Sequence, residues 1–263
     1  MTTLASPQNL PGSFSGGTRR PELVVALDTP ALDKAEEWVE SLAGLVHWFK
    51  VGLELYTAAG PAALELPSKY GGHVFWDAKL HDIPHTVAAA ARQAARAGVD
   101  MLTVHAAGGP AMVAAAVAAC REEAARRGST PPLVVAVTVL TSLSTETLVQ
   151  LGLGSDPARI GATWALLAVD AGADGVVAAV PDVAKIRAQV GRRALIVTPG
   201  IRPAGGSGTG ASTDGPDDQA RVATPAAARA AGSDFVVVGR PITRAKDPVQ
   251  AALSILTELG EPG

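Results

Sequence analysis

The stretch HVFWDAKLHDIPHTVAAAARQAARAGVDMLTVHA, residues 73–106, contains two apolar segments separated by an alanine-rich segment. The apolar segments, 73–80 and 101–106, have the length and composition of β-strands, and residues 84–98 between them have the length of a helix. Parallel strands need such a crossover, whereas antiparallel strands can be joined by a short turn. The stretch therefore predicts one unit of a parallel sheet that is covered by helices.

The same alternation recurs along the whole chain of 263 residues. We place the strands at 23–28, 48–53, 73–80, 101–106, 132–141, 175–180, 195–199 and 234–239. We place the helices at 31–46, 56–69, 84–98, 110–127, 144–170, 182–191, 224–231 and 248–258. The segment VVAVTVL (134–140) is apolar on both faces, as in strands buried beneath helices. Eight such units predict a single-domain α/β protein, a (β/α)8 TIM barrel; a doubly wound open sheet is the alternative.

Composition narrows the possible functions and the cellular location. The formal net charge is −3 and Lys and Arg are scattered, so we expect a small-molecule partner and no nucleic acid. No apolar segment reaches the roughly 18 residues of a membrane span, so we expect no membrane association. A single cysteine, Cys120, fits a reducing cytoplasm. Residues 1–22, with three prolines and three glycines, are expected to form a disordered leader before a catalytic barrel domain at 23–260.

Several polar residues lie at the ends of predicted strands, where barrel enzymes carry their active sites. Asp77 and Lys79 are two apart on one strand, so both should share a face with Phe75 and point into the barrel. Lys50 interrupts the apolar segment WFKVGL (48–53), and nearby aspartates would keep such a buried lysine charged. The other strand-end residues are Asp28, His105, Thr141 and Ser142. These positions predict an array of alternating acids and bases.

A second group of residues predicts phosphate binding. The loops after the seventh and eighth strands often form the phosphate site of this fold, and here they contain TPGIR (198–202) and VVGRPI (237–242). Gly239 lets the backbone approach a phosphate, and Arg202 and Arg240 supply guanidinium donors. The glycine-rich segment at about 203–218 predicts a mobile lid loop, with a disordered insertion as the alternative.

These motifs together resemble those of the bacterial orotidine 5'-monophosphate decarboxylase family. They are ALD (26–28), FKVG (49–52), DAKLHDIPHT (77–86), TVLTSL (138–143), VTPGIRP (197–203), DDQARV (217–222) and VVVGRPIT (236–243). The resemblance covers about residues 23–255. The aspartate and lysine motif alone is shared with a wider group of phosphosugar lyases, whereas the whole set, in this order, is specific.

The resemblance implies a role for each site residue. Lys79 would donate a proton to ring carbon 6, beside Asp77, Lys50 and, from the partner of a homodimer, Asp82. The remaining substrate-binding residues would be Asp28 and Lys50 at the ribose, Thr141 at the pyrimidine, Thr86 at the dimer interface, and Arg202, Gln219, Gly239 and Arg240 at the phosphate. The reaction would convert orotidine 5'-monophosphate to uridine 5'-monophosphate and carbon dioxide in de novo pyrimidine biosynthesis, without a metal or organic cofactor.

The residues themselves leave two other functions open. A magnesium-dependent hexulose-phosphate decarboxylase or synthase of the same superfamily would use Asp77, Asp82 or His105 at the metal. A barrel that binds phosphate without catalysis is the other possibility, although it gives no reason to retain buried charges. We expect His81 and His85 to be loop or interface residues, because their spacing defines no zinc site.

Overall fold

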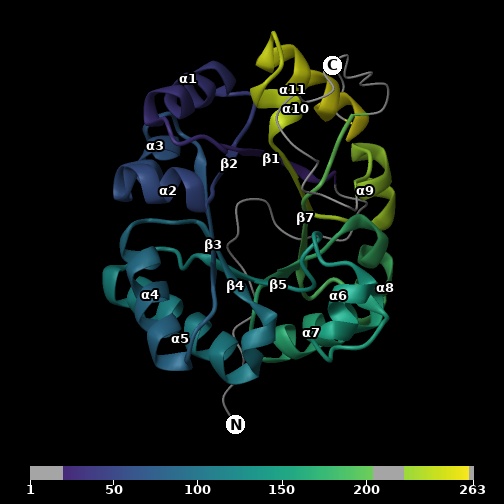
Figure 1. The fold of residues 1–263 in the computed structure, drawn as a ribbon. Helices are drawn as coiled ribbons and strands as arrows, with labels where there is room; N and C mark the ends of the chain where they lie inside the picture. The colour runs from purple at the N-terminus through teal and green to yellow at the C-terminus, as the bar shows by residue number, and fades with distance from the viewer. Residues whose placement is uncertain (1–19, 204–221, 261–263) are drawn as a thin grey trace.

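The computed structural model describes residues 20–203 and 222–260, and its eight strands form a closed parallel barrel surrounded by helices (Figure 1). Each strand pairs with the next one along the chain, and β8 pairs with β1. The strands are β1 (Glu22–Ala26), β2 (Trp48–Val51), β3 (His73–Leu80), β4 (Met101–His105), β5 (Leu133–Val137), β6 (Gly175–Val177), β7 (Leu195–Thr198) and β8 (Phe235–Val238). The predicted barrel is confirmed, and the open sheet is wrong.

The helices follow the strands in the expected order. They are α1 (Leu32–Leu42), α2 (Leu53–Ala59), α3 (Pro61–Lys69), α4 (Pro84–Arg96), α5 (Gly109–Arg127), α6 (Thr145–Gln150), α7 (Pro157–Asp170), α8 (Val180–Val190), α9 (Pro225–Ala231), α10 (Arg240–Thr243) and α11 (Pro248–Glu258), with a 3-10 turn, η1 (Ala106–Gly108). None of the described helices combines the length and the apolar composition that a membrane span requires.

Several predicted boundaries are wrong, and each error has a local cause. The helix predicted at 56–69 is two helices, because Gly60 adopts a φ of 61° and Pro61 begins the second one. The helix predicted at 144–170 is also two, and Asp156 caps the start of α7 by accepting a hydrogen bond from the Arg159 amide. The fifth strand ends at Val137 instead of 141, and α10 was not predicted. β1 begins at Glu22, inside the predicted leader, of which 1–19 lie outside the described residues.

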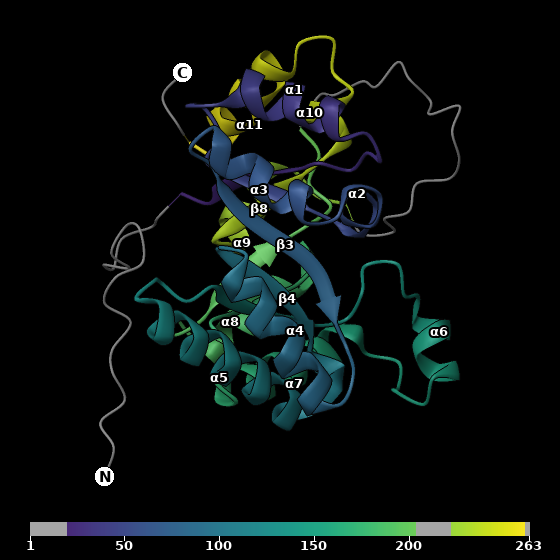
Figure 2. The ribbon, with the colours of Figure 1, turned by 90° about the vertical axis from the view of Figure 1, so that its left-hand side faces the viewer.

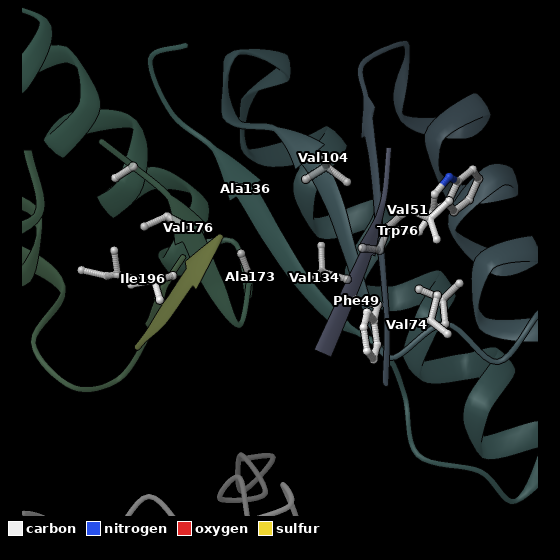
Figure 3. Packing of buried hydrophobic residues seen from close by; sticks show 14 of the residues in the cluster. Phe49, Val51, Val74, Trp76, Val104, Val134, Ala136, Ala173, Val176 and Ile196 are labelled. Carbon is white, nitrogen blue, oxygen red and sulfur yellow. The ribbon is translucent and has the colours of Figure 1, made fainter. Parts of the chain in front are cut away.

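The barrel packs on two surfaces, as expected for strands that are apolar on both faces. The interior cluster contains Val24, Ala26, Trp48, Phe75, Met101, Leu133, Val135, Leu195, Val197, Phe235 and Val237. The alternate residues of the strands point outward and pack against the helices, and Figure 3 shows part of this larger cluster, including Val51, Val74 and Trp76. Side chains that follow the interior residues along each strand therefore point into the C-terminal end of the barrel.

A four-residue motif, AGxD, is repeated at the opposite end of the barrel. AGVD (97–100), AGAD (171–174) and AGSD (231–234) each precede an even-numbered strand. In each motif the aspartate carboxylate accepts a hydrogen bond from the second amide of the preceding strand, at Val74, Val134 and Ile196 respectively. These bonds tie neighbouring strands together at their N-terminal ends, the face of this fold that serves stability.

The C-terminal ends of the strands face the loops that follow them. In Figure 2 the arrowhead of β3 points toward this side of the barrel, and α6 stands away from the other helices on the same side. Asp28, Lys50, Asp77 and Lys79 follow the interior residues of β1, β2 and β3 on this side. The fold thus collects the predicted charged residues at one end.

Candidate active site

Four charged side chains from the first three strands form a continuous array at the C-terminal end of the barrel. The Lys50 ammonium lies 3.0 Å from Asp28 Oδ1 and 3.6 Å from Asp77 Oδ2. The Lys79 ammonium lies 2.7 Å from the same Asp77 Oδ2. We call Asp28, Lys50, Asp77 and Lys79 the charged array. It joins three strands through alternating negative and positive groups, as the sequence predicted.

Burial differs between the members of the charged array. The Lys50 and Asp77 side chains are 12% and 13% exposed, whereas Lys79 is 33% and Asp28 is 53% exposed. Lys50 and Asp77 therefore form the buried centre, and Lys79 and Asp28 are the more exposed members of the array. Gly52 follows β2, where a Cβ would lie 3.0 Å from Lys50 Nζ, so the missing side chain leaves room for that ammonium.

The two buried members stabilise each other's charged forms. Burial alone would lower the pKa of Lys50, but Asp28 and Asp77 more than offset this effect and raise it. Burial alone would raise the pKa of Asp77, but the Lys50 and Lys79 charges and the hydrogen bonds to Lys79 and Thr103 lower it. Both groups are therefore charged across the neutral pH range.

Lys79 has an unusual backbone conformation. It is the only described residue other than glycine with a positive φ, at 48°. Trp76 pairs with Leu102 and Leu80 pairs with Val104, so four steps along β3 match two along β4 and β3 contains two extra residues. A bulge of this kind re-aims side chains and is common beside active sites. Because of the bulge, the simple alternation of side chains along a strand does not explain where the Lys79 side chain points, although its ammonium reaches Asp77 as predicted.

Thr103, which the sequence analysis did not select, lies opposite this bulge. Its side chain is completely buried in the third position of β4. The hydroxyl oxygen accepts a hydrogen bond from the Lys79 amide at 2.8 Å and donates one to Asp77 Oδ1 at 3.1 Å. The signal in the sequence was a hydroxyl two residues after an interior residue, Met101, in an otherwise apolar strand.

The predicted phosphate residues lie after β7 and β8. Gly239 follows β8 beside Asp28, and a Cβ there would lie 3.3 Å from Asp28 Oδ2. Arg240 begins α10, and the Arg202 amide donates a hydrogen bond to the Ala223 carbonyl across the base of the predicted lid. Gln219 and the lid at 203–218, apart from Pro203, lie outside the described residues.

Three predicted residues do not join the charged array within one chain. Asp82 and Thr86 are exposed at the start of α4, where Asp82 accepts a hydrogen bond from the Ile83 amide. Asp82 is therefore exposed in the single chain and lies outside its charged array. Thr141 does not end a strand as predicted: β5 stops at Val137, and Thr141 lies in the turn that follows.

Two histidines, His81 and His105, lie beside each other near the charged array. The His105 ring ends β4 and lies 5.1 Å from the His81 ring, measured between centroids. Burial, followed by the charges of His81 and Lys79, lowers the pKa of His105. In the described part of the chain, no three His, Cys, Asp or Glu side chains are grouped as metal ligands.

The chain is similar to known proteins over nearly its whole length. Residues 21–255 match the model of the orotidine 5'-phosphate decarboxylase / HUMPS family. Orotidine 5'-phosphate decarboxylase from Moorella thermoacetica is 51% identical over 90% of this chain and 92% of its own length. The enzyme of that name from Syntrophotalea carbinolica is 48% identical over 91% and 95%.

A solved structure gives the same result. The crystal structure of orotidine 5'-phosphate decarboxylase from Lactobacillus acidophilus has a TM-score of 0.78 and 34% sequence identity, covering 92% of this chain and 100% of that one. Sequence, fold and the order of the motifs agree. The chain belongs to the orotidine 5'-phosphate decarboxylase / HUMPS family.

Proposed function

We propose that the protein is a decarboxylase that converts orotidine 5'-monophosphate to uridine 5'-monophosphate and carbon dioxide, a step of pyrimidine biosynthesis. The similarity to enzymes of that name supports the reaction, and the geometry of the charged array supports the proposed residues. The observation that carries the assignment is the Lys79 ammonium, held 2.7 Å from a buried carboxylate while its side chain stays partly exposed. Such a group can contact a substrate at the open end of the barrel.

The proposed chemistry requires stabilisation of a carbanion. When the bond between ring carbon 6 and the carboxylate breaks, its electron pair stays on carbon 6 and carbon dioxide leaves. A fixed ammonium beside that carbon stabilises the developing negative charge and then donates a proton to it. Lys79 is the proton donor in this scheme. Bulk water then restores the lysine proton after product release.

Asp77 and Lys50 hold that ammonium in place. Asp77 Oδ2 accepts from Lys79 and faces Lys50 at 3.6 Å, so two cations share one carboxylate oxygen. Because the groups are arranged before the substrate binds, little reorganisation is needed when charge develops. We propose that Asp28 and Lys50 also contact the ribose, because their ion pair lies at the edge of the array toward β1.

The phosphate would bind next to the Asp28 end of the charged array, at the loops after β7 and β8. Arg202, Gly239 and Arg240, together with Gln219, are the proposed phosphate contacts, and Thr141 is the proposed pyrimidine contact. Gly239 lies next to Asp28, so a phosphate at β8 and a ribose at Asp28 would be neighbours, as they are in a nucleotide. Binding energy from the phosphate can then favour the transition state at a remote carbon.

The magnesium-dependent lyase is less well supported by the geometry. Asp77 Oδ1 accepts from Thr103, and Oδ2 accepts from Lys79 and faces Lys50. A metal ion at Asp77 would have to displace an ammonium group. We therefore propose that the reaction needs no metal, and we also propose that it needs no organic cofactor. We propose the cytoplasm as its location, because the single cysteine, the buried Cys120, would stay reduced there.

A direct assay separates these functions. Purified protein with excess chelator is mixed with orotidine 5'-monophosphate, and the loss of its absorbance is followed. Turnover under these conditions supports the proposal. No turnover by folded protein, together with turnover of a hexulose phosphate after magnesium is added, would reject it.

We also propose a homodimer in which Asp82 and Thr86 reach the partner's site. Both residues are exposed in the single chain, next to Ile83, an apolar side chain that is 64% exposed. Mixing inactive Lys79→Ala and Asp82→Asn proteins tests this arrangement. A symmetric dimer that assorts at random would regain about a quarter of its sites, whereas an Asp82 that acts within its own chain would give no recovery.

A further inference from the structure

Thr103 connects two members of the charged array although it carries no charge. β4 alternates between outward residues, Leu102 and Val104, and inward residues, Met101 and Thr103. The adjacent interior residues on β4 and β5, Met101 and Val135, are apolar, so a buried hydroxyl there needs a polar partner from β3. Thr103 has two such partners, and both belong to the array residues of β3.

The first partner is the backbone of Lys79. The two extra residues of β3 take the Lys79 amide out of the regular register with β4. A left-handed conformation is unfavourable for a residue with a side chain, so other contacts must hold Lys79 at a φ of 48°. The Thr103 hydroxyl accepts the displaced amide hydrogen at 2.8 Å and thus replaces the missing strand bond.

The second partner is the carboxylate of Asp77. Because the hydroxyl oxygen accepts from Lys79, its own hydrogen is free to point at Asp77 Oδ1, 3.1 Å away. Fixing Oδ1 also fixes the rotation of the carboxylate. Oδ2 is then directed at the Lys79 ammonium. One hydroxyl therefore sets both the backbone of Lys79 and the direction of its counter-ion.

We propose that Thr103 is a positioning residue for the decarboxylation, whose hydroxyl holds Asp77 and Lys79 in the geometry that proton donation requires. The inference rests on the proposed function. Thr103 touches no substrate in this scheme and acts only through its two partners. Its loss should therefore lower kcat and leave KM for the nucleotide nearly unchanged, because the phosphate and ribose contacts come from other strands.

Serine and alanine at position 103 form a matched pair that differs in one hydroxyl. We expect kcat of Thr103→Ala to fall about 10- to 100-fold, since misplacement of a catalytic group by a fraction of an ångström has effects of this size. Thr103→Ser should stay close to the wild type. Ser233→Ala controls for the loss of any buried hydroxyl, because Ser233 is buried just before β8 and its hydroxyl bonds Thr198, away from the array.

Amide hydrogen exchange at Lys79 gives a readout that does not depend on activity. The Lys79 amide should exchange several-fold faster in Thr103→Ala than in Thr103→Ser, because only serine can accept its hydrogen. Equal kcat and equal exchange in the two variants would overturn the role of Thr103. A wild type without turnover would instead reject the proposed function, and the exchange comparison would still decide the positioning claim.

Discussion

Replacing Lys50 with methionine tests the buried centre of the charged array. Methionine has a similar length but no charge, so the change removes the ammonium that lies between two carboxylates. Asp28 Oδ1 is 3.0 Å and Asp77 Oδ2 is 3.6 Å from that ammonium. Among the described residues, Asp77 would keep Lys79 as its cation, and Asp28 would lose the ion pair that it forms with Lys50.

The expected loss of stability follows from these distances and from burial. At an effective dielectric constant of about 20, each ion pair attracts by about 5 kcal/mol before the cost of desolvation. Breaking a buried pair typically costs about 3–5 kcal/mol, because one charge is left uncompensated. Asp77 retains a partner and Asp28 is 53% exposed, so we expect the free energy of unfolding to fall by about 2–3 kcal/mol.

Thermal and urea unfolding measure this loss. For a chain of this size the expected change in Tm is about 5–10 °C, and decarboxylation should also be largely lost. Lys34→Met is the matched control, because Lys34 forms an exposed pair with Glu37 that is worth less than about 1 kcal/mol. Equal Tm values for the two variants would refute the claim that Lys50 stabilises a buried charge cluster.

Three further predictions concern other parts of the molecule. Asp234→Asn weakens the bond to the Ile196 amide and the pair with Arg187, so urea unfolding should show a loss of about 1–2 kcal/mol with unchanged kcat. The pKa of Asp77 lies below its ordinary value of 3.8, so the stabilisation from its charge is fully present above pH 3.8 and is lost only as the pH falls through the lower pKa of the folded state. The pH profile of kcat should therefore show no ionisation of Asp77 between about pH 5 and 9. Arg240→Met should raise KM for the nucleotide about 10- to 100-fold, and an unchanged KM would remove Arg240 from the phosphate site.

The fold could be predicted because the information for it is distributed along the chain. Eight apolar segments separated by helical segments define the barrel even when individual boundaries are wrong. The errors occurred where one residue changes the backbone direction, as at Gly60, or where an apolar segment continues beyond the end of its strand, as after Val137. The AGxD motif was visible as a short internal repeat, but its role depends on hydrogen bonds between strands that the sequence does not display.

The charged residues of the candidate site could be predicted from the sequence, but the backbone bulge and the hydroxyl that position them could not. Lys50, Asp77 and Lys79 stand out because charged residues are rare in apolar strands. The bulge in β3 and the left-handed backbone of Lys79 leave no such mark, since neither glycine nor proline accompanies them. Thr103 was missed for a related reason, because a threonine is ordinary in a strand. Its hydroxyl contacts the Lys79 amide only because β3 bulges opposite it.

The most direct test of the central claim is the decarboxylation of orotidine 5'-monophosphate by the wild type and by Lys79→Ala, both in excess chelator. Circular dichroism first establishes that the variant is folded. We predict turnover by the wild type to uridine 5'-monophosphate and carbon dioxide, and none that is measurable by the variant. Near-normal turnover by Lys79→Ala, or no turnover by folded wild type, would contradict the assignment of Lys79 as the proton donor in a charged array.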